Sequence, residues 1–234
     1  MNEPRAPAPG VTAPRTTFAL LVAASAALAI VGALFDGNAR WLHYVSKPLA
    51  TLLLLWMVLG AAPVVASGYQ RLIAVGLVLS AVGDTFLMLR GDWFVPGLVS
   101  FLLAHIAYAT AFARGASTGA TAVALLAYAS VSALVLVGLL PSVPTALQPP
   151  VVAYVAVIAV MAALAAARGW RLRNTPVQTA HPARIAALGG ALFILSDTLL
   201  AWNRFVTDIP VAIVWVLASY YAAQWCIADS VRGA

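Results

Sequence analysis

The chain has 234 residues, of which 63% are hydrophobic and only 9% are charged. A soluble domain carries about 25% charged residues, so the composition excludes an ordinary soluble protein and predicts a polytopic integral membrane protein. The net charge of +6 comes from 13 basic and 7 acidic residues. The arginines fall mostly at the ends of apolar segments, where they set membrane topology and meet lipid phosphates. We therefore expect no nucleic-acid partner.

Cysteine and histidine are scarce. Cys226 is the single cysteine, which excludes a disulfide within the chain and a thiolate metal cluster. The three histidines, His43, His105 and His181, lie far apart in the sequence, and a zinc site needs three or four ligands. We expect neither a metal nor a cofactor.

The chain begins with a stretch that we expect to be disordered, residues 1–16, which holds four prolines. Apolar runs bounded by charges, glycine and proline then predict eight membrane spans, because a span needs about 20 residues. They are residues 17–35, 47–62, 71–90, 94–113, 120–140, 150–167, 184–203 and 209–228. No loop or open sheet edge can face lipid, so the predicted fold is all-α, a bundle of eight transmembrane helices over residues 17–230.

The basic residues predict the orientation of this bundle. An even number of spans places both termini on the same side of the membrane. With the N-terminus inside, the cytoplasmic segments hold nine basic residues: Arg5, Arg15, Arg71, Arg114, Arg168, Arg171, Arg173, Arg184 and Arg232. The opposite side then holds four: Arg40, Lys47, Arg90 and Arg204. Because cytoplasmic loops carry the excess of Lys and Arg, we expect both termini in the cytoplasm. The expected location is a bacterial plasma membrane.

Two aspartates lie inside apolar segments in nearly the same phrase. Residues 80–88 read Ser-Ala-Val-Gly-Asp-Thr-Phe-Leu-Met, and residues 195–201 read Leu-Ser-Asp-Thr-Leu-Leu-Ala. A carboxylate at such a depth costs several kcal/mol unless it is paired, protonated or in contact with water. Function is therefore the default interpretation of Asp84 and Asp197, and an interhelical hydrogen bond that stabilises the fold is the alternative.

The predicted topology places the two aspartates at similar depth. Spans 71–90 and 184–203 run in the same direction, and each aspartate follows the arginine at the start of its span by 13 residues. At about 1.5 Å per residue, both lie roughly 20 Å from the cytoplasmic end. We therefore expect Asp84 and Asp197 in the outer half of the bilayer, where they could share one cavity.

Polar side chains of neighbouring spans are candidates to surround this pair. They are Ser80, Ser100, His105, Tyr108, Ser196, Tyr220, Tyr221 and Gln224. Buried phenols and amides need hydrogen-bond partners, so we expect Tyr220, Tyr221 and Gln224 to face the interior. A lone histidine such as His105 is more often a hydrogen-bonded core residue than a ligand.

The outer ends of the spans carry cations. Lys47 precedes Pro48 at the predicted start of span 47–62, where proline commonly opens a helix. Asn203 and Arg204 follow each other at the end of span 184–203. Cations at this level could bind a lipid phosphate, or they could simply mark span ends by extending to the interface.

Several phrases in order resemble a known family. They are Lys47-Pro48-Leu49, Gly83-Asp84-Thr85-Phe86-Leu87, Gly97-Leu98-Val99-Ser100-Phe101 with His105 and Tyr108, Phe193-Ile194-Leu195-Ser196-Asp197 with Asn203-Arg204-Phe205, and Tyr220-Tyr221-Ala222-Ala223-Gln224. Together they resemble the YhhN family of membrane proteins, whose animal members are lysoplasmalogenases of the transmembrane-protein-86 type. The resemblance covers about residues 20–230, while no single phrase is specific.

The resemblance implies an eight-helix membrane ether hydrolase whose substrate is a lysophospholipid within the bilayer. It would cleave the sn-1 vinyl ether of a lysoplasmalogen to a fatty aldehyde and glycerophosphoethanolamine or glycerophosphocholine. The two intramembrane aspartates of the family would correspond to Asp84 and Asp197. Nothing in the resemblance bears on the oligomeric state.

Vinyl ether hydrolysis makes use of two carboxyl groups. One protonates the β-carbon to create an oxocarbenium ion, and the other stabilises this cation and orients water, as in glycosidases. We expect Asp84 and Asp197 to divide these roles, in either order, and an Asn replacement of each to abolish turnover without loss of expression. His105, Tyr108, Tyr220 and Gln224 would orient water or the carboxyl groups, while Lys47 and Arg204 would bind the phosphate.

The competing interpretation is a proton-coupled transporter or a lipid-binding membrane protein that uses the same aspartates. Paired carboxylates in a repeated phrase also suit proton coupling. However, spans 71–90 and 184–203 are predicted to be parallel, so an inverted repeat is not supported. A purely structural helper protein is a third possibility.

Overall fold

The computed structural model describes residues 15–35, 37 and 39–233, and these residues form an all-helical bundle. The eight α-helices are α1 Arg15–Leu34, α2 Arg40–Leu59, α3 Ser67–Met88, α4 Phe94–Ala113, α5 Thr118–Leu139, α6 Gln148–Arg171, α7 Val177–Phe205 and α8 Ala212–Asp229. Two short 3-10 turns, η1 Leu140–Ser142 and η2 Thr145–Leu147, join α5 to α6. The predicted all-α class is confirmed for the described ranges.

Seven of these helices, α1 to α7, are long and apolar enough to cross a membrane. The chain is therefore an integral membrane protein. The eighth predicted span corresponds to α8, which is not among the seven; its 18 residues include the polar Tyr220, Tyr221, Gln224 and Asp229. The existence of an eighth helix is confirmed, whereas its passage through the membrane stays a prediction.

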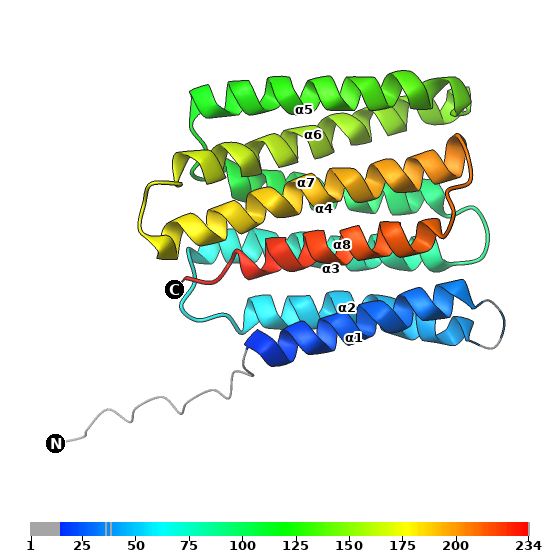
Figure 1. Ribbon diagram of the computed structural model, residues 1–234, viewed down its shortest axis with the longest axis horizontal. Coiled ribbons are helices and arrows are strands. Elements are labelled where there is room, and N and C mark those ends of the chain that lie inside the picture. The colour runs from blue at the N-terminus through cyan, green and yellow to red at the C-terminus, as the bar shows by residue number, and fades with distance from the viewer. Residues whose placement is uncertain (1–14, 36, 38, 234) are drawn as a thin grey trace.

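Each helix runs antiparallel to the next one in the chain, because the connections between them are short (Figure 1). As a result α1 begins and α8 ends at the same end of the bundle. The main packing pairs are α1 with α2, α3 with α4, α6 with α7 and α7 with α8. Helices α3 and α7 run in the same direction, so the predicted parallel orientation of the two aspartate-bearing helices is confirmed.

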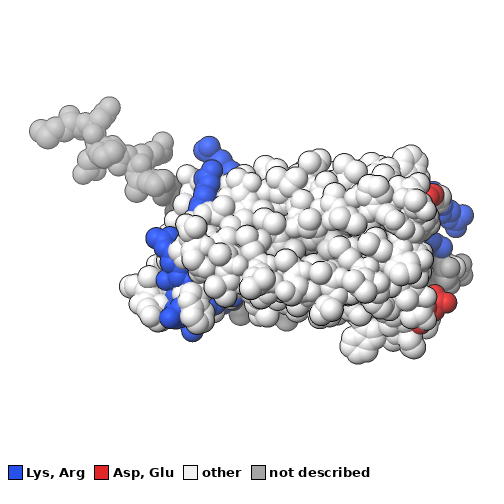
Figure 2. Space-filling model, turned by 90° about the horizontal axis from the view of Figure 1, so that it is seen from above, with Lys and Arg blue, Asp and Glu red and all other residues white. Residues whose placement is uncertain are grey.

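Charged side chains lie at the two ends of the bundle. Figure 2 shows Lys and Arg concentrated at the end where the chain termini lie, with a wide uncharged band before the other end. Exposed Arg71, Arg114, Arg171 and Arg184 belong to the first end, and exposed Arg90 and Arg204 to the second. Such a band is expected of a surface that faces lipid hydrocarbon.

Two helices begin before the membrane spans that the sequence predicts, and the expectation that Pro48 opens a helix was wrong. Helix α2 begins at Arg40 instead of residue 47, so Pro48 lies inside the helix and does not open it. Likewise α7 begins at Val177 instead of residue 184 and contains Pro182. The prediction treated Lys47 and Arg184 as span ends because charge is costly in lipid. The charge of Lys47 is compensated inside the bundle, and exposed Arg184 lies on a part of α7 near the Arg-rich end.

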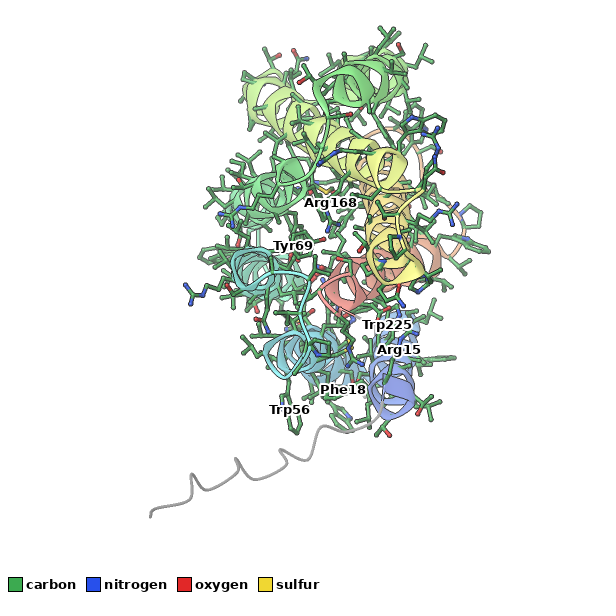
Figure 3. All side chains as sticks on the ribbon, turned by 90° about the vertical axis from the view of Figure 1, so that its left-hand side faces the viewer. Arg15, Phe18, Trp56, Tyr69, Arg168 and Trp225 are labelled. Atoms are coloured by element: carbon green, nitrogen blue, oxygen red, sulfur yellow. The ribbon has the colours of Figure 1, made fainter. Side chains whose placement is uncertain are left out.

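The predicted disordered stretch, residues 1–16, lies outside the described residues as far as residue 14. Arg15 and Thr16 form the first turn of α1. The side chain of Arg15 makes an ion pair with Asp229 near the end of α8, with Nη2 and Oδ2 2.7 Å apart. On the same side of the bundle, the rings of Phe18 in α1 and Trp56 in α2 pack edge to face with their centroids 5.7 Å apart (Figure 3).

The core lies between α3, α4, α6, α7 and α8 and extends to α1 and α2. Its largest fully buried side chains include Tyr108, Phe112 and Phe193. Close packing of α3 on α4 depends on small residues, because a Cβ at Gly83 would lie 2.6 Å from Cδ2 of Phe101. Near the Arg-rich end, buried Arg168 places its guanidinium 4.6 Å from the ring centroid of Tyr69 (Figure 3).

Candidate active site

Asp84 lies in the centre of a buried polar network. Its side chain is on α3 and the residue is 1% exposed. Nζ of Lys47 on α2 lies 3.1 Å from Oδ1 of Asp84. Oδ2 accepts hydrogen bonds from the hydroxyls of Thr51 at 3.2 Å and Tyr220 at 2.6 Å. Two helices, α2 and α8, thus supply one cation and two hydroxyl donors to this carboxylate on α3, which is what a buried ionised group requires.

The network continues along α8. Nε2 of Gln224 donates to the hydroxyl of Tyr220 at 3.1 Å, and the hydroxyl of Tyr108 on α4 donates to Oε1 of Gln224 at 2.8 Å. The hydroxyl of Tyr221 donates to the backbone carbonyl of Lys47 at 3.1 Å. The predicted inward orientation of these three α8 side chains is therefore confirmed. A connected network of this kind fixes the rotamers of the residues that hold Asp84.

Asp197 has a simpler environment. It lies on α7 and accepts a hydrogen bond from the hydroxyl of Tyr154 on α6. In the described parts of the chain, no Lys or Arg forms an ion pair with it. The two aspartates therefore differ in kind, since Asp84 is paired with a cation and Asp197 with a phenol.

Both aspartates line the same cavity, as their similar predicted depth suggested. The cavity has a volume of about 190 Å³ and is lined by residues of α2 to α8. Lys47, Tyr154 and Tyr220 add polar atoms to its wall, and most of the remaining lining is aliphatic or aromatic. An elongated apolar ligand with one reactive polar group fits such a lining.

His105 and Ser80 lie behind this wall. His105 is fully buried, and its ring lies 4.8 Å from that of Phe193 and 5.4 Å from that of Tyr154, between centroids. Within the described residues, neither ring nitrogen of His105 has a hydrogen-bond partner, and the same holds for the hydroxyl of buried Ser80. Buried polar atoms are rarely left unpaired in proteins. The ring nitrogens of His105 and the hydroxyl of Ser80 are therefore free to form hydrogen bonds with a bound water or ligand.

Three predicted site residues form hydrogen bonds to the backbone of another helix or of a loop. The hydroxyl of Ser100 donates to the carbonyl of Leu79 at 2.7 Å, and that of Ser196 to the carbonyl of Val216 at 3.0 Å. Oδ1 of Asn203 accepts a hydrogen bond from the backbone N–H of Ile209 at 2.9 Å. Of the three, Ser196 also lines the cavity.

The two predicted phosphate-binding cations lie in different places. Lys47 is 6% exposed and paired with Asp84, so its predicted position at the outer rim was wrong. Arg204 is at the Arg-poor end, where its guanidinium lies 4.1 Å from the ring centroid of Phe94 and 5.5 Å from that of Phe205. Both rings line the cavity, and Nη2 of Arg204 lies 3.3 Å from Oδ1 of exposed Asp92.

Sequence reasoning missed Thr51 and Tyr154. Thr51 follows Lys47 by four residues and therefore lies on the same face of α2, a spacing that could have revealed it. Tyr154 gives no such local signal, because its partner Asp197 is 43 residues away on another helix. The described residues contain no group of three or more His, Cys, Asp or Glu side chains that could hold a metal ion.

Comparison with known proteins supplies the remaining observation. The model of the YhhN family matches residues 42–231 of the chain. "Lysoplasmalogenase TMEM86A" of Homo sapiens is 35% identical over 199 residues, which cover 83% of this chain and 80% of that protein. "Lysoplasmalogenase TMEM86B" of Sus scrofa is 32% identical over 197 residues, covering 84% and 78%.

The match to "Lysoplasmalogenase TMEM86A" of Bos taurus is shorter. It is 35% identical over 162 residues, which cover 68% of this chain and 64% of the bovine protein, somewhat less than two thirds of its length. No solved structure matches the chain. The resemblance carried by the ordered phrases of the sequence is confirmed by the family match.

Proposed function

Because the chain belongs to the YhhN family, we propose that it is a membrane hydrolase that cleaves the sn-1 vinyl ether bond of lysoplasmalogens. The products are a fatty aldehyde and a glycerophosphoethanolamine or glycerophosphocholine. Relatives named lysoplasmalogenases support the substrate class. The observation that carries the proposal is the pair of aspartates, Asp84 and Asp197, on the wall of one largely apolar cavity.

The different environments of the aspartates support a division of roles. Asp84 is held by a lysine and two hydroxyls, which suits a carboxylate that stays ionised. Asp197 has no paired cation among the described residues, which suits a carboxyl group that carries a proton. The hydrogen bond from Tyr154 orients this carboxyl group. We therefore assign Asp197 as the general acid and Asp84 as the carboxylate that stabilises positive charge.

The reaction then proceeds in two steps. Asp197 transfers its proton to the β-carbon of the vinyl ether, and the electron pair of the double bond forms the new C–H bond, leaving an oxocarbenium ion. Water adds to the adjacent carbon and returns a proton to Asp197, and the resulting hemiacetal collapses to aldehyde and alcohol. The negative charge of Asp84 faces the cation across the cavity, which lowers the barrier by electrostatic stabilisation.

Among the described residues, the buried polar atoms of His105 and Ser80 lack hydrogen-bond partners, which supports a role for them in binding the water that the reaction consumes. His105 and Ser80 can hold water close to the site, since Ser80 is one helical turn from Asp84 and His105 packs on Tyr154. The network of Tyr108, Gln224 and Tyr220 keeps the Asp84 carboxylate oriented.

Arg204 is a better candidate than Lys47 for binding the lipid phosphate. It lies over two rings that line the cavity, at the end where the headgroup of a lipid in that leaflet is found. Asp92 restrains Arg204 without burying it. The observed ion pair of Lys47 assigns this residue to Asp84 and not to the phosphate.

The topology that we propose has eight membrane spans and cytoplasmic termini. Helix α8 packs against α7, α2 and α1, and Tyr220, Tyr221 and Gln224 are buried. These polar side chains therefore face protein and do not oppose insertion. The concentration of arginine at the end where the termini lie supports a cytoplasmic location for that end. The part of the cavity that Phe94 and Phe205 line then lies toward the outer leaflet.

Two variants test the aspartate pair in purified, detergent-solubilised protein. Asp197→Asn should lower aldehyde release from lysoplasmalogen by about 10²- to 10⁴-fold, the usual contribution of a general acid, and leave folding intact. Asp84→Asn alone would strand a buried lysine, which costs about 3–5 kcal/mol of stability. The informative variant is therefore Asp84→Asn with Lys47→Met, which removes both charges and should also be inactive.

Asp208→Asn is the matched control, because Asp208 is an exposed aspartate in the α7–α8 connection. It should keep full activity. Near-normal turnover by Asp197→Asn or by the double variant would disprove the pair mechanism. Hydrolysis needs no sealed compartment, so failure of the parent protein to release aldehyde in detergent would favour the transporter or lipid-binding interpretation.

A further inference from the structure

Lys47 is the one lysine among the 13 basic residues of the sequence. Its side chain is 8% exposed, lines the cavity together with both aspartates, and lies 3.1 Å from Oδ1 of Asp84. The hydrolysis mechanism needs Asp84 as a carboxylate, but it gives Lys47 no role beyond that of a counter-ion. An arginine would serve as a counter-ion too, and the chain uses arginine at every other basic position.

A lysine differs from an arginine in one chemical respect that matters in this cavity. Its amine condenses with aldehydes to form an imine, and buried lysines in apolar sites are the ones that proteins use for this chemistry. The proposed reaction releases a fatty aldehyde into the same cavity. A nucleophilic nitrogen and an electrophilic carbonyl group are thus confined together.

We propose that Lys47 is a covalent, reversible binding site for long-chain aldehydes, held as a protonated imine with Asp84 as its counter-ion. The inference rests on the proposed function only for the natural source of the aldehyde. The binding chemistry itself depends on the amine, the carboxylate and the apolar cavity.

The step is balanced without any further reagent. Asp84 takes one proton from the Lys47 ammonium, and the free amine attacks the carbonyl carbon to form a C–N bond. The oxygen of the resulting carbinolamine receives protons and leaves as water, and a C=N double bond forms. Overall, one ammonium group and one aldehyde give one iminium group and one water molecule.

The surroundings of Lys47 suit the iminium product. The positive charge stays on the same nitrogen. The ion pair with Asp84 is therefore maintained, and the buried carboxylate keeps its partner. Thr51 and Tyr220 continue to donate hydrogen bonds to Asp84. Leu87, Leu98, Phe101 and Leu217 line the cavity and offer apolar contacts to the alkyl chain. A longer alkyl chain should therefore bind more tightly, because each methylene buried in an apolar site adds to the binding free energy.

Reductive trapping tests the proposal. The folded protein in detergent is incubated with hexadecanal or with propanal and sodium cyanoborohydride, which reduces an iminium to a stable secondary amine. Peptide mass mapping should find the hexadecyl adduct on Lys47 and little propyl adduct there. The N-terminal amine of the purified protein serves as the internal control, since it should react with both aldehydes.

Lys47→Arg keeps the positive charge beside Asp84 but removes the primary amine, so the adduct in this segment should be lost. The mapping on the unaltered protein does not depend on how well this variant folds. Labelling of the N-terminal amine alone would overturn the proposal, and so would equal labelling of Lys47 by both aldehydes. Labelling of Lys47 only after denaturation would overturn it as well.

A second arm separates this inference from the proposed function. Lysoplasmalogen replaces the added aldehyde, and the parent protein is compared with Asp197→Asn. An adduct from lysoplasmalogen in the parent protein but not in Asp197→Asn supports both proposals. An adduct from hexadecanal but none from lysoplasmalogen supports the aldehyde site and contradicts the hydrolase. Release of free aldehyde without any Lys47 adduct supports the hydrolase and contradicts the aldehyde site.

Discussion

Tyr154 is the residue on which the role of Asp197 depends most directly. Its hydroxyl donates a hydrogen bond to the Asp197 carboxyl group, and its ring packs on His105 and lines the cavity. No other side-chain hydrogen bond to Asp197 occurs within the described residues. The phenol therefore decides how the carboxyl group is oriented toward a bound vinyl ether, and we regard Tyr154 as a positioning residue.

Tyr154→Phe should lower kcat by about 10-fold or more, in line with the loss of correct orientation of a catalytic group, and change KM little. Tyr128→Phe on α5 is the control, because this half-buried tyrosine has no hydrogen bond in the described structure. Steady-state kinetics with lysoplasmalogen provides the measurement. A Tyr154→Phe enzyme with unchanged kcat would show that Asp197 is oriented by other means.

The residue scale also shows what local sequence can and cannot reveal. The repeated phrase around each aspartate and its hydrophobic surroundings were enough to select Asp84 and Asp197 as candidate site residues. It was not enough to predict that Lys47 pairs with Asp84, because the two residues are 37 positions apart on different helices. Lysine in an apolar segment can pair within the protein or extend to the interface, and only the packing of α2 against α3 decides between these outcomes.

At the scale of the helices, close packing of α3 on α4 determines where the network lies. Glycines on α3 let the aromatic side chains of α4 approach the helix backbone. A Cβ at Gly76 would overlap the ring of Tyr108, which is fully buried and bonded to Gln224. Small residues at helix interfaces commonly have this role in membrane proteins.

Gly76→Ala should therefore destabilise the protein by about 1–3 kcal/mol, the usual cost of overpacking. The gain in helix propensity from Gly to Ala, about 1 kcal/mol, does not offset this cost. Gly119→Ala on α5 is the matched control, because a Cβ there meets no atom within 4 Å. Thermal unfolding in detergent should show a lower Tm for Gly76→Ala and an equal or higher Tm for Gly119→Ala. Equal Tm values for both variants would contradict close packing at Gly76.

Helix boundaries were predicted less well than the number of helices, because they too depend on contacts that a single segment does not reveal. Charged residues mark span ends in a sequence, yet α2 and α7 each begin seven residues before the predicted start. A helix can extend beyond the hydrocarbon layer, and a buried charge can be compensated by another helix. Neither effect is visible in a single segment.

At the scale of the whole molecule, the alternating helix directions place the α6–α7 and α7–α8 connections at opposite ends (Figure 1). The first of these ends is rich in arginine (Figure 2). The positive-inside rule then predicts a cytoplasmic α6–α7 connection and an external α7–α8 connection.

Single-cysteine labelling in intact cells tests this topology. In a Cys226→Ser background, Asp208→Cys should react with a membrane-impermeant maleimide, and Asn174→Cys should react only after permeabilisation. A cysteine added after residue 234 should behave like Asn174→Cys, because α8 returns the chain to the cytoplasm. Labelling of that added cysteine in intact cells would show that α8 does not cross the membrane. The reverse labelling of residues 174 and 208 would show the opposite orientation.

The sequence by itself determined the membrane class, the helical fold and the family, and it indicated the two aspartates as candidate site residues, because hydrophobicity and local phrases are properties of single segments. The tertiary structure decided which groups face each aspartate. It placed Lys47, Thr51 and Tyr220 around Asp84, and Tyr154 beside Asp197. These contacts join helices that are distant in the chain, and the physical reason for them is that a buried charge must find its partners across helix interfaces.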